Sequence, residues 1–378
     1  MSLFLLWFLF GIGIFIQAVY LLLIFGKIVF FSRKKSIEES SPSEGVTVVI
    51  AARNEYHNLK NLIPKIFEQE YEKFELLIID DRSTDRTHRL LLEMMAIYPK
   101  LRTVIIKYTP EHVTAKKYAL TLGIKVAKND VILLTDADCI PESKLWIQKM
   151  TAPVRLEKKT FSIGFSGYEK KSGFLNNWIQ FETLLTALFY LSFGLWKMPF
   201  MGVGRNLCYR KNFFMEAKAF KGLWQIEGGD DDLFVNRYAS GKNTALVIDP
   251  DANTLSKAKT NRKDYFRQKK RHLHAGKYYR GKDKQKIGFY AFSHVLFWAG
   301  GIGLLFYFGL EENWEQFFIV FGIILLRSTL FSLVMYLSSK KIQGVNQTKI
   351  PWLYDFLYLG YFWVIGTISY QAKTIQWK

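Results

Sequence analysis

Cysteine is scarce in this chain, whose 378 residues include only Cys139 and Cys208. Two cysteines so far apart cannot supply the closely spaced ligands of a structural zinc site or the disulfide framework of a small secreted domain. We therefore interpret both as free thiols. Histidine is also scarce, with six residues, and His272 and His274 have no third ligand near them in the sequence. This argues against zinc at that pair.

Acidic residues are few, with 33 Asp and Glu against 52 Lys and Arg, which gives a formal net charge of +19. An excess of positive charge can serve nucleic-acid binding, but the chain has no nucleic-acid recognition motif, and its apolar ends also argue against this class. Attraction to anionic lipids and to a phosphorylated substrate is the simpler explanation. We therefore expect a membrane partner and no nucleic acid.

The N-terminal residues 3–25 form a nearly continuous apolar run. At about 1.5 Å per residue, a helix of this length can cross a hydrocarbon core of about 30 Å. A cleaved signal peptide would have a basic start and a shorter apolar region, and neither is present. Lys27 and the basic group of Arg33, Lys34 and Lys35 follow the run. The positive-inside rule then places the next part of the chain in the cytoplasm.

Three more apolar runs lie near the C-terminus, at 287–310, 317–337 and 351–370. The acidic link EENWEQ (311–316) suits the outer face of the membrane, and the basic link that opens SSKKIQ (338–343) suits the inner face. The last run is the least hydrophobic, because an aspartate and several tyrosines dilute it. We expect a multi-pass protein of the cell (inner) membrane.

Between these ends, short β-rich runs alternate with helical stretches. Strands are predicted at 46–52, 74–80, 103–106 and 131–136, and helices at 56–69, from Thr84 and at 115–127. This alternation predicts a mostly parallel α/β sheet with helices on both faces. The expected domains are an N-terminal transmembrane anchor (1–31), a cytoplasmic domain (45–280) and about three transmembrane helices (287–371).

Polar and acidic residues follow three of the predicted strands, as ARNE (52–55), DDRSTD (80–85) and DADC (136–139). Each motif alone could be an ordinary helix cap. Together, at the carboxyl ends of strands in one sheet, they favour a ligand site, because ligands bind at that edge of α/β sheets. The alternate aspartates Asp136 and Asp138 suit Mg²⁺ or Mn²⁺, which prefer oxygen ligands and commonly bridge carboxylates to substrate phosphates.

At this point the motifs resemble those of a known family. The runs VTVVIAARNE, LLIIDDRSTDRT, AKKYALTLGI and VILLTDADC, followed in order by GVGRNLCYRK, GGDDDLFVNR and RQKKRH, are similar to inverting family 2 glycosyltransferases. The resemblance covers about 45–275. It implies a GT-A-type, Rossmann-like mixed sheet with flanking helices. It also implies metal-assisted sugar transfer, with inversion, from a nucleoside diphosphate sugar (UDP is the expected nucleotide) to a hydroxyl of a lipid or other membrane-associated glycan acceptor.

The resemblance also implies roles for individual residues. Those at the donor site are Ala52, Arg53, Asn54 and Glu55 lining the nucleotide pocket, Asp81 facing the base with Asp80 beside it, and Lys116 near the donor. Within the D-x-D pair, Asp138 is the expected direct metal ligand, and Asp136 lies nearer the donor sugar or ribose. The segment after the lysine reads ALT rather than the family's ALN, a departure that weakens the assignment of Lys116.

GGDDDL (228–233) replaces the family's usual E-D-x-x-L motif. Counted back from Leu233, Asp230 occupies the position of the general base, and Gly229 occupies the position of the glutamate. Asp231 and Asp232 are expected to open the helix that follows, where the helix dipole favours negative charge.

RQKKRH (267–272) resembles the family's Q/R-x-x-R-W signature, with Gln268 and Arg271 in place and His272 where tryptophan is usual. Arg271 could contact a diphosphate, since a guanidinium matches phosphate oxygens. The same segment could instead be a basic helix on the anionic leaflet. The apolar stretch 184–204 is either a buried helix or an interfacial helix that brings the site to a lipid acceptor. A further span there would separate Asp230 from Asp138 and is rejected.

Three other functions remain open. A processive polysaccharide synthase would use the later helices as a channel, but His272 and the small number of helices argue against it. A catalytically inactive nucleotide-sugar-binding scaffold is compatible with the glutamate missing before Asp230. A transporter would need paired broken helices or intramembrane charge pairs, and the sequence indicates neither, although Arg327 and Asp355 lie within the apolar runs.

Overall fold

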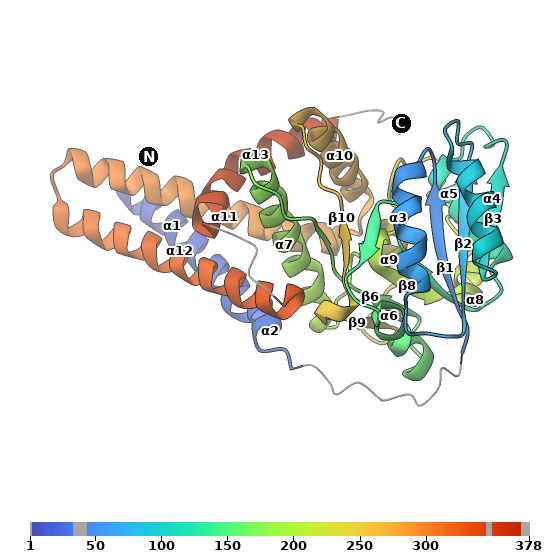
Figure 1. The fold of residues 1–378 in the computed structure, drawn as a ribbon. Coiled ribbons are helices and arrows are strands. Elements are labelled where there is room, and N and C mark those ends of the chain that lie inside the picture. Colours follow the sequence, from blue (N-terminus) through green and yellow to red (C-terminus); the bar gives the residue numbers. More distant parts are fainter. Residues whose placement is uncertain (1, 33–43, 345–349, 372–378) are drawn as a thin grey trace. The chain divides into compact units, whose positions relative to one another are not determined.

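The computed structural model describes residues 2–32, 44–344 and 350–371, which divide into two compact units. The first, here called the helical unit, contains the chain up to Phe31, Lys170–Trp196 and the C-terminal part from Thr260. The second, the α/β unit, contains Ser32–Glu169 and Lys197–Lys259. Figure 1 labels most of the elements of both. The basic group of Arg33, Lys34 and Lys35 lies outside the described residues.

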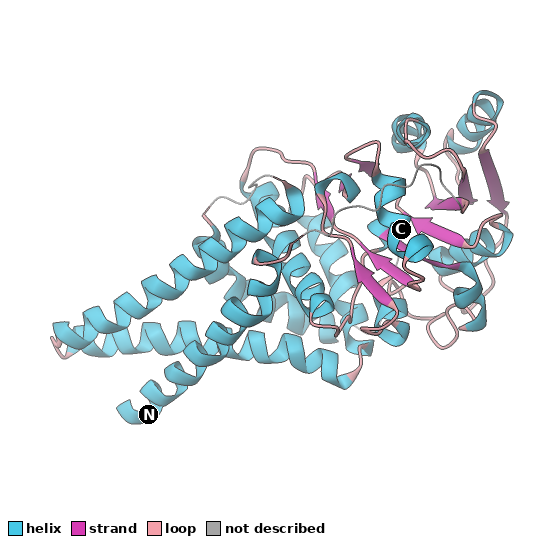
Figure 2. Cartoon of the chain, turned by 90° about the horizontal axis from the view of Figure 1, so that it is seen from below, coloured by secondary structure: helices cyan, strands magenta, loops and turns pink. Residues whose placement is uncertain are grey.

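A seven-stranded sheet forms the centre of the α/β unit, with the order β3-β2-β1-β4-β8-β6-β9. Its strands are β1 (Val46–Ala52), β2 (Phe74–Asp81), β3 (Leu101–Ile106), β4 (Val131–Leu134), β6 (Phe161–Ile163), β8 (Leu207–Arg210) and β9 (Thr244–Leu246). Strands β3, β2, β1 and β4 are mutually parallel, whereas β8 runs antiparallel to both β4 and β6. The sheet is therefore mixed, and the predicted α/β class is confirmed. Figure 2 shows the strands gathered in this part of the chain.

Helices cover both faces of the parallel strands, which explains why β1 and β2 are apolar along almost their whole length. On one face, Val48 and Ile50 of β1 pack in a core with residues of α3 (Tyr56–Phe67), α4 (Thr87–Ile97) and α6 (Trp146–Leu156). On the other face, α5 (Ala115–Val126) contacts β1 and β2. The carboxyl ends of β1, β2 and β4 consequently meet at one edge of the sheet.

A second sheet of three short strands begins directly after the D-x-D pair. Its order is β5 (Cys139–Pro141), β10 (Thr254–Ser256) and β7 (Ser166–Tyr168), and β10 pairs antiparallel with β5 and parallel with β7. The remaining elements of the α/β unit are η2 (Gly204–Asn206), α8 (Lys211–Glu216), α9 (Asp232–Tyr238) and η3 (Pro250–Ala252). The small sheet fixes the chain on the C-terminal side of Asp138.

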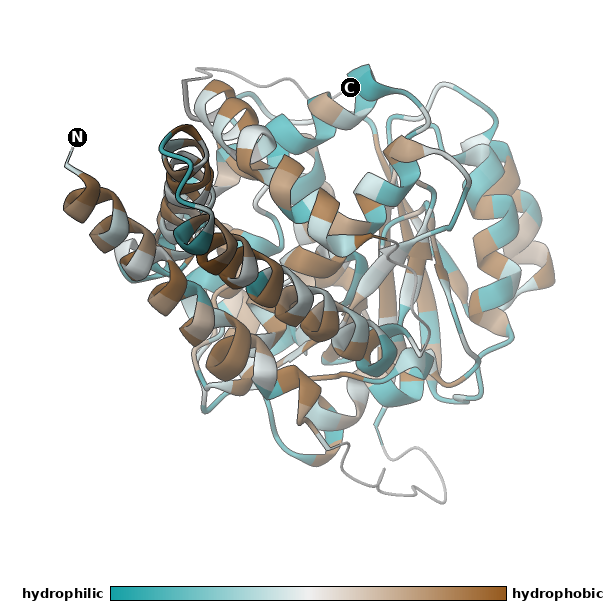
Figure 3. Cartoon of the chain, turned by 90° about the vertical axis from the view of Figure 1, so that its left-hand side faces the viewer, coloured by the Kyte–Doolittle hydropathy of each residue, from teal (hydrophilic) through white to brown (hydrophobic). Residues whose placement is uncertain are grey.

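The helical unit is built from helices alone within the described residues. They are α1 (Leu3–Ala18), the π-helical η1 (Val19–Phe25), α2 (Gly26–Val29), α7 (Phe174–Leu195), α10 (Arg262–Ala275), η4 (Gly276–Tyr278), α11 (Gly281–Leu310), α12 (Trp314–Gln343) and α13 (Pro351–Gln371). Four segments are long and apolar enough to cross a membrane: Leu3–Val29, Phe174–Leu195, Gly281–Leu310 and Trp314–Gln343. In Figure 3 the long helices beside the N-terminus are mainly brown, that is, hydrophobic.

Two differences from the predicted spans concern α7 and α13. The segment that contains α7 meets the criteria of length and hydropathy, but 83% of its apolar window is buried inside the protein. A spanning helix at the edge of a bundle would expose an apolar face to lipid, so this burial agrees with the alternative of a buried helix for the stretch 184–204. Helix α13 is not among the four candidate spans found in the described residues.

The first and third candidate spans pack closely because each carries glycine at the contact. A Cβ atom on Gly13 of α1 would lie 2.7 Å from the backbone nitrogen of Phe297, and one on Gly300 of α11 would lie 3.1 Å from the Cβ of Phe10. Small residues that allow such an approach are characteristic of helix contacts in membranes. The contact fixes the N-terminal helix against α11.

The expectation that the apolar runs hold no charge pair is wrong. Arg327 of α12 and Asp355 of α13 form a buried ion pair, and the Arg327 guanidinium also donates to Gln17 of α1. The Trp298 indole nitrogen donates to Asp355 at 3.1 Å, and the His294 Nε2 lies 3.1 Å from the same carboxylate. The residues come from four helices, so their separation in sequence hides the pairing. Buried charges in apolar surroundings are normally neutralised in this way.

Candidate active site

The loops after β1 and β2 are joined by one side chain. The Asn54 carboxamide oxygen accepts hydrogen bonds from the Thr84 backbone at 2.7 Å and the Asp85 backbone at 3.3 Å, and the Asn54 backbone donates to the Ser83 hydroxyl at 2.9 Å. Asn54 has a φ of 57°, a left-handed conformation that asparagine tolerates better than most residues. ARNE and DDRSTD thus form one continuous rim at the carboxyl edge of the sheet.

The other residues predicted for the nucleotide pocket lie on this rim. Ala52 is the buried last residue of β1, and Arg53 is exposed. The Glu55 backbone donates to the Thr87 hydroxyl at 2.9 Å. Their shared location supports a common site, while their contacts with a nucleotide stay a prediction.

Asp80 and Asp81 end β2 and are both buried, with 2% of their surface exposed. The Asp80 carboxylate accepts from the Ser83 backbone at 3.1 Å, and Asp81 accepts from Arg82 at 2.8 and 3.2 Å. The two acids are therefore held by their own loop. A ligand that used Asp81 would compete with Arg82 for the carboxylate.

The D-x-D pair stands after β4, where Asp136, Asp138 and Cys139 bring their ligand atoms within 4.8 Å of one another. Two carboxylates offer the hard oxygen ligands that Mg²⁺ and Mn²⁺ prefer. The Cys139 thiol is buried and lies 2.9 Å from the Ser256 hydroxyl, and its burial, with Asp138 and Asp136 nearby, raises its pKa well above the usual value. The donor set therefore fits a hard divalent cation held by the two aspartates.

Arg205 provides a positive charge beside this pair and was missed as a site residue. Its guanidinium donates to the Ser256 hydroxyl at 2.9 Å and lies 4.4 Å from the centre of the Tyr168 ring. Burial raises the pKa of Asp138 and the neighbouring Asp136 raises it further, whereas Arg205 lowers it without reversing the shift. The sequence could have indicated Arg205, because it is the arginine of the motif GVGRN.

Lys116 links the D-x-D pair to the third acidic motif. Its ammonium nitrogen lies 3.0 Å from an oxygen of Asp136 and 3.0 Å from an oxygen of Asp230. Burial acts to lower the pKa of Lys116, but the charges of Asp136 and Asp230 raise it overall. For Asp230, burial acts to raise the pKa, but Lys116 and Lys117 lower it overall. Lys116 is therefore protonated and Asp230 is ionised at neutral pH.

Lys117, the next residue, was also missed by the sequence interpretation. It is almost fully buried, and its ammonium group donates to the carbonyl oxygens of Ile226 and Gly228. Burial lowers its pKa, although Asp230 and Asp232 act in the opposite direction. Lys117 thus holds the segment that leads to Asp230. The sequence feature that could have indicated this role is the second lysine of AKK (115–117).

The backbone conformation explains the glycine at position 229. Gly228 and Gly229 have φ values of +74° and +73°, which residues with a side chain rarely adopt. A Cβ atom on Gly229 would lie 2.3 Å from Cδ1 and 2.7 Å from Cγ of Leu233. A glutamate cannot occupy this position unless the turn changes.

The three adjacent aspartates do different things. Asp231 is the N-cap of α9: one carboxylate oxygen accepts from the Asp232 backbone at 2.8 Å, and the other accepts from the Gly204 backbone. Asp232 is the first residue of α9, and its side chain accepts from the Leu233 backbone at 2.8 Å. The prediction that these two residues open the helix is confirmed, although Asp232 is buried. Asp230 is the member of the row that lies beside Lys116.

Comparison with known proteins assigns this architecture. The family model described as glycosyl transferase family 2 matches residues 47–223. Residues 47–223 form a glycosyl transferase family 2 domain. The predicted recognition is confirmed, and the domain contains both loops of the rim, Lys116, the D-x-D pair and Arg205. The match ends before Asp230.

Two curated relatives are similar to part of this chain. A β-monoglucosyldiacylglycerol synthase from a Nostoc species is 31% identical over 107 residues, which cover 28% of this chain and 22% of the relative. A poly-β-1,6-N-acetyl-D-glucosamine synthase from Staphylococcus aureus is 32% identical over 97 residues, covering 26% and 22%. The chain thus spans about a fifth of the length of each.

Among solved structures, a mannosyltransferase from Pyrobaculum calidifontis in complex with GDP-Man and Mn²⁺ is similar over 96% of this chain and 98% of its own. The TM-score is 0.57 and the sequence identity is 14%. This similarity supports the GT-A-type fold that was predicted.

Gln268 and Arg271 lie outside the family 2 domain, on α10 of the helical unit. Lys269, between them, is buried and forms an ion pair of 2.6 Å with Glu182 of α7. The predicted contact of Gln268 and Arg271 with the donor stays a prediction.

Proposed function

We propose that this protein is a membrane-bound glycosyltransferase. It transfers a sugar from a nucleoside diphosphate sugar to a hydroxyl of a membrane-associated acceptor, with inversion and with Mg²⁺ or Mn²⁺. The observation that carries the proposal is the position of Lys116, 3.0 Å from both Asp136 and Asp230. This position supports an active site in which one lysine side chain contacts both a ligand of the cation and the general base.

Asp230 acts as the general base in this proposal. An ionised carboxylate can accept the proton of the acceptor hydroxyl as that oxygen attacks the anomeric carbon. Lys116 and Lys117 favour the ionised form of Asp230. Asp231 is unsuited to this role, because both of its oxygens already accept backbone hydrogen bonds. These contacts select one aspartate of the three.

Asp138 and Asp136 hold the divalent cation, which when bound would neutralise charge on the leaving diphosphate. Arg205 adds a fixed positive charge on the same side. Asn54 holds the two nucleotide loops together, so that Asp81 and the residues 52–55 face the same bound donor. Each of these groups acts on the donor rather than on the acceptor.

We further propose that the protein is located in the cell (inner) membrane, with the α/β unit in the cytoplasm. Lys340 and Lys341 in the last turn of α12 and the acidic link between α11 and α12 support this orientation. UDP is the proposed nucleotide. GDP sugars belong in the donor panel, because the structurally similar mannosyltransferase was solved with GDP-Man.

The test uses the full chain purified in detergent and returned to lipid vesicles. Radiolabelled UDP-glucose, UDP-N-acetylglucosamine and GDP-mannose are supplied with Mg²⁺ or Mn²⁺, and the lipid and polymer fractions are analysed. Asp138→Asn and Asp230→Asn should each lower transfer at least a hundredfold. The matched control is Asp251→Asn, which changes a half-exposed aspartate paired with Lys149 in the same unit. Transfer that survives in either active-site variant contradicts the mechanism.

A processive polysaccharide synthase is the second candidate, and the similarity to the poly-β-1,6-N-acetyl-D-glucosamine synthase favours it. His272 in place of the tryptophan argues against it. Product sizing separates the two, because one added sugar supports single transfer and a ladder supports polymerisation. The hypothesis of a catalytically inactive scaffold is weakened, because the backbone conformation at Gly229 explains the missing glutamate without a loss of function.

A further inference from the structure

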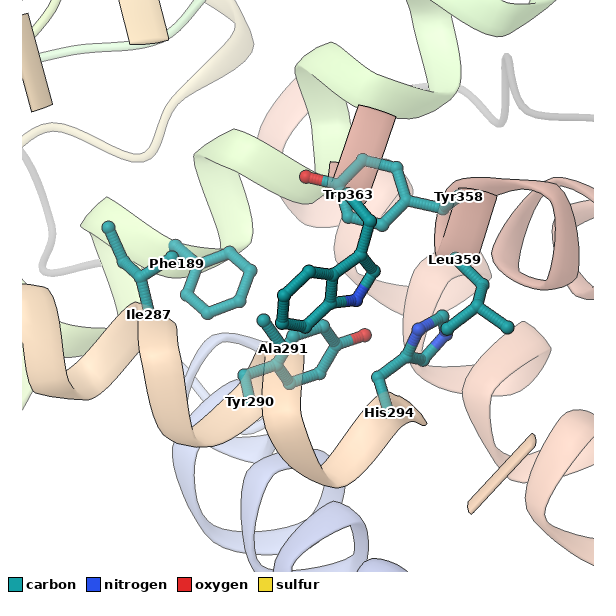
Figure 4. Close-up of a pocket in the computed structure, with 8 residues that line it drawn as sticks. All are labelled: Phe189, Ile287, Tyr290, Ala291, His294, Tyr358, Leu359 and Trp363. Carbon is teal, nitrogen blue, oxygen red and sulfur yellow. The ribbon is translucent and has the colours of Figure 1, made fainter. Parts of the chain in front are cut away.

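The helical unit contains a small cavity between α7, α11 and α13. Its volume is about 20 Å³, which is room for about one water molecule. Figure 4 shows Phe189, Tyr290 and Trp363 among the side chains that line it. A nucleotide, a sugar ring or an acyl chain does not fit into this volume. The cavity therefore offers no substrate site, and the contacts with the donor belong to the α/β unit.

Several cations lie around the proposed donor site of the α/β unit, and most already have protein partners. The ammonium group of Lys116 pairs with two carboxylates, and that of Lys117 donates to two carbonyl oxygens. The Arg205 guanidinium donates to the Ser256 hydroxyl at 2.9 Å and to two carbonyl oxygens at 3.3 and 3.4 Å. These contacts fix the three groups and use most of their hydrogen-bond donors.

Two more lysines follow strand β10, and they differ in their partners. Lys257 is exposed, and its ammonium group donates to the Asn58 carboxamide oxygen at 2.8 Å. Lys259 is half-buried, and it makes no hydrogen bond or ion pair with any other residue that the structure describes. The ammonium group of Lys259 is therefore available to a ligand.

Strand β10 directs the chain that carries Lys259 along the D-x-D pair. The strand runs antiparallel to β5, with Ser256 opposite Cys139. Cys139 directly follows the D-x-D pair, so the chain that leaves β10 passes the pair in the opposite direction. If the same register continued beyond Ser256, Lys259 would lie opposite Asp136.

The electrostatics of Asp138 agree with this placement. Burial and the neighbouring Asp136 raise the pKa of Asp138, whereas the positive charges of Arg205 and then Lys259 act to lower it. The lysine is thus close enough to act on the D-x-D pair, although it does not form an ion pair with it. A second anion beside the pair would bring the ammonium group a direct partner.

We propose that Lys259 binds the diphosphate of the donor and donates a hydrogen bond to an oxygen of the β-phosphate, the one bonded to the sugar. In the proposed function the D-x-D pair holds the diphosphate through its cation, and Asp136 shares Lys116 with the base Asp230. The sugar carbon and its phosphate then belong on the side of Asp136, where Lys259 would lie. The proposal rests on the proposed function and deepens it by naming a residue that acts on the leaving group.

A cation in this position acts on the bond that breaks. The acceptor oxygen forms a bond to the anomeric carbon while the bond from that carbon to the β-phosphate oxygen breaks, and the electron pair of the broken bond stays on the diphosphate. The proton of the acceptor hydroxyl goes to Asp230. A lysine ammonium is a compact charge with three donors, so Lys259 would stabilise the charge that develops on the leaving diphosphate.

The first experiment measures binding without turnover. The full chain in detergent is titrated calorimetrically with UDP and GDP in the presence of Mn²⁺, and then with UMP and GMP. Lys259→Met should weaken binding of the preferred diphosphate at least tenfold and change binding of the monophosphate less than twofold, because a monophosphate lacks the β-phosphate. The matched control is Lys257→Met, the same loss of charge two residues away, which should change binding of the diphosphate less than threefold.

A conservative variant separates the contact from misfolding. Lys259→Arg keeps a donor and a positive charge, so it should bind the diphosphate within threefold of the wild type. Equal losses in Lys259→Met and Lys257→Met would show only a general effect of charge and would overturn the proposal. Unchanged binding in Lys259→Met, or a loss in Lys259→Arg as large as in Lys259→Met, would overturn it as well. If the wild type binds neither diphosphate, the contact proposed for Lys259 is wrong.

Turnover gives the second readout. At saturating donor, Lys259→Met should lower kcat at least thirtyfold, because the lost contact is strongest as the leaving group gains charge, and Lys257→Met should stay within threefold. An unchanged kcat would overturn the role of Lys259 in the departure of the diphosphate. If binding of the diphosphate depends on Lys259 as expected while no nucleotide sugar is consumed, the proposed function fails and the phosphate contact stands.

Discussion

A methyl group added at Gly229 should disable the enzyme more than it destabilises the fold. The new Cβ would lie 2.3 Å from Cδ1 of Leu233, and the residue would have to keep a φ of +73°. The left-handed conformation costs about 1–2 kcal/mol for a residue with a side chain, and overpacking a buried site costs about 1–3 kcal/mol. Gly229→Ala should therefore lose about 2–5 kcal/mol if the turn keeps its geometry.

The turn can avoid part of this cost by shifting, and Asp230 would shift with it. A displacement of about 1 Å at a catalytic group can lower the rate about a hundredfold. We expect Gly229→Ala to lower the initial rate of sugar transfer at least thirtyfold, with a smaller fall in the midpoint of thermal unfolding. Rates are measured in vesicles with the donor identified by the panel, and unfolding is followed in detergent.

Gly222→Ala is the matched control, because Gly222 has the same φ of +73° and a Cβ there would meet only the end of the Arg237 side chain, at 3.4 Å. Gly222→Ala should lose only the stability that the left-handed backbone conformation costs, about 1–2 kcal/mol, and should leave the rate of sugar transfer nearly unchanged. Equal rates in the two variants would refute the reasoning, since the contact with Leu233 would then have no effect on Asp230.

Three further predictions concern charges. Lys117→Met should lower kcat at least tenfold, because the carbonyl oxygens of Ile226 and Gly228 lose their donor; steady-state kinetics at saturating donor would show this, and an unchanged kcat would contradict it. Burial acts to raise the pKa of Glu75, but the Lys128 backbone, Arg102 and Thr47 lower it overall. Ionised Glu75 therefore stabilises the folded protein at a pH above its unfolded-state pKa, and this stabilisation is lost as the pH falls through its folded-state pKa. Glu75→Gln should thus cost about 1–3 kcal/mol at pH 7, and the unfolding midpoints of variant and wild type should converge as the pH falls through the lowered folded-state pKa of Glu75; a difference independent of pH would contradict this. Asp355→Asn should destabilise the helical unit by about 3–5 kcal/mol by leaving Arg327 uncompensated, and adding Arg327→Met should recover part of the loss in detergent melts; no recovery would mean that the pair does not act as a unit.

The strands of the α/β unit could be predicted well from the sequence, because their signal is local. VTVVIAA coincides with β1, and FELLIID ends one residue before β2 does. A buried parallel strand must be apolar on both faces, so it appears as a continuous Val, Ile and Leu run. The polar residues at the strand ends were found for the same reason, since the parallel order brings those ends together.

What the sequence did not reveal depends on contacts between distant residues. Lys117 acts on a carbonyl 111 positions away, and Arg327 meets both Gln17 and Asp355 across helices. The glycine at 229 could be recognised as unusual, but its reason lies in a backbone angle and in the side chain of Leu233. The sequence left open whether the stretch that contains α7 is buried, since apolar composition alone does not distinguish a helix surrounded by protein from one surrounded by lipid.

Lys116 has one ammonium group and two carboxylates at equal distance. Whatever occupies the donor side and draws Asp136 toward itself leaves that ammonium to Asp230 alone. The environment of the proposed base then depends on whether the donor has arrived, although the donor need not touch it. A single shared cation would in this way couple the two substrate sites, since Lys116 would pair more closely with Asp230 and hold it more firmly in its ionised form once the donor is bound.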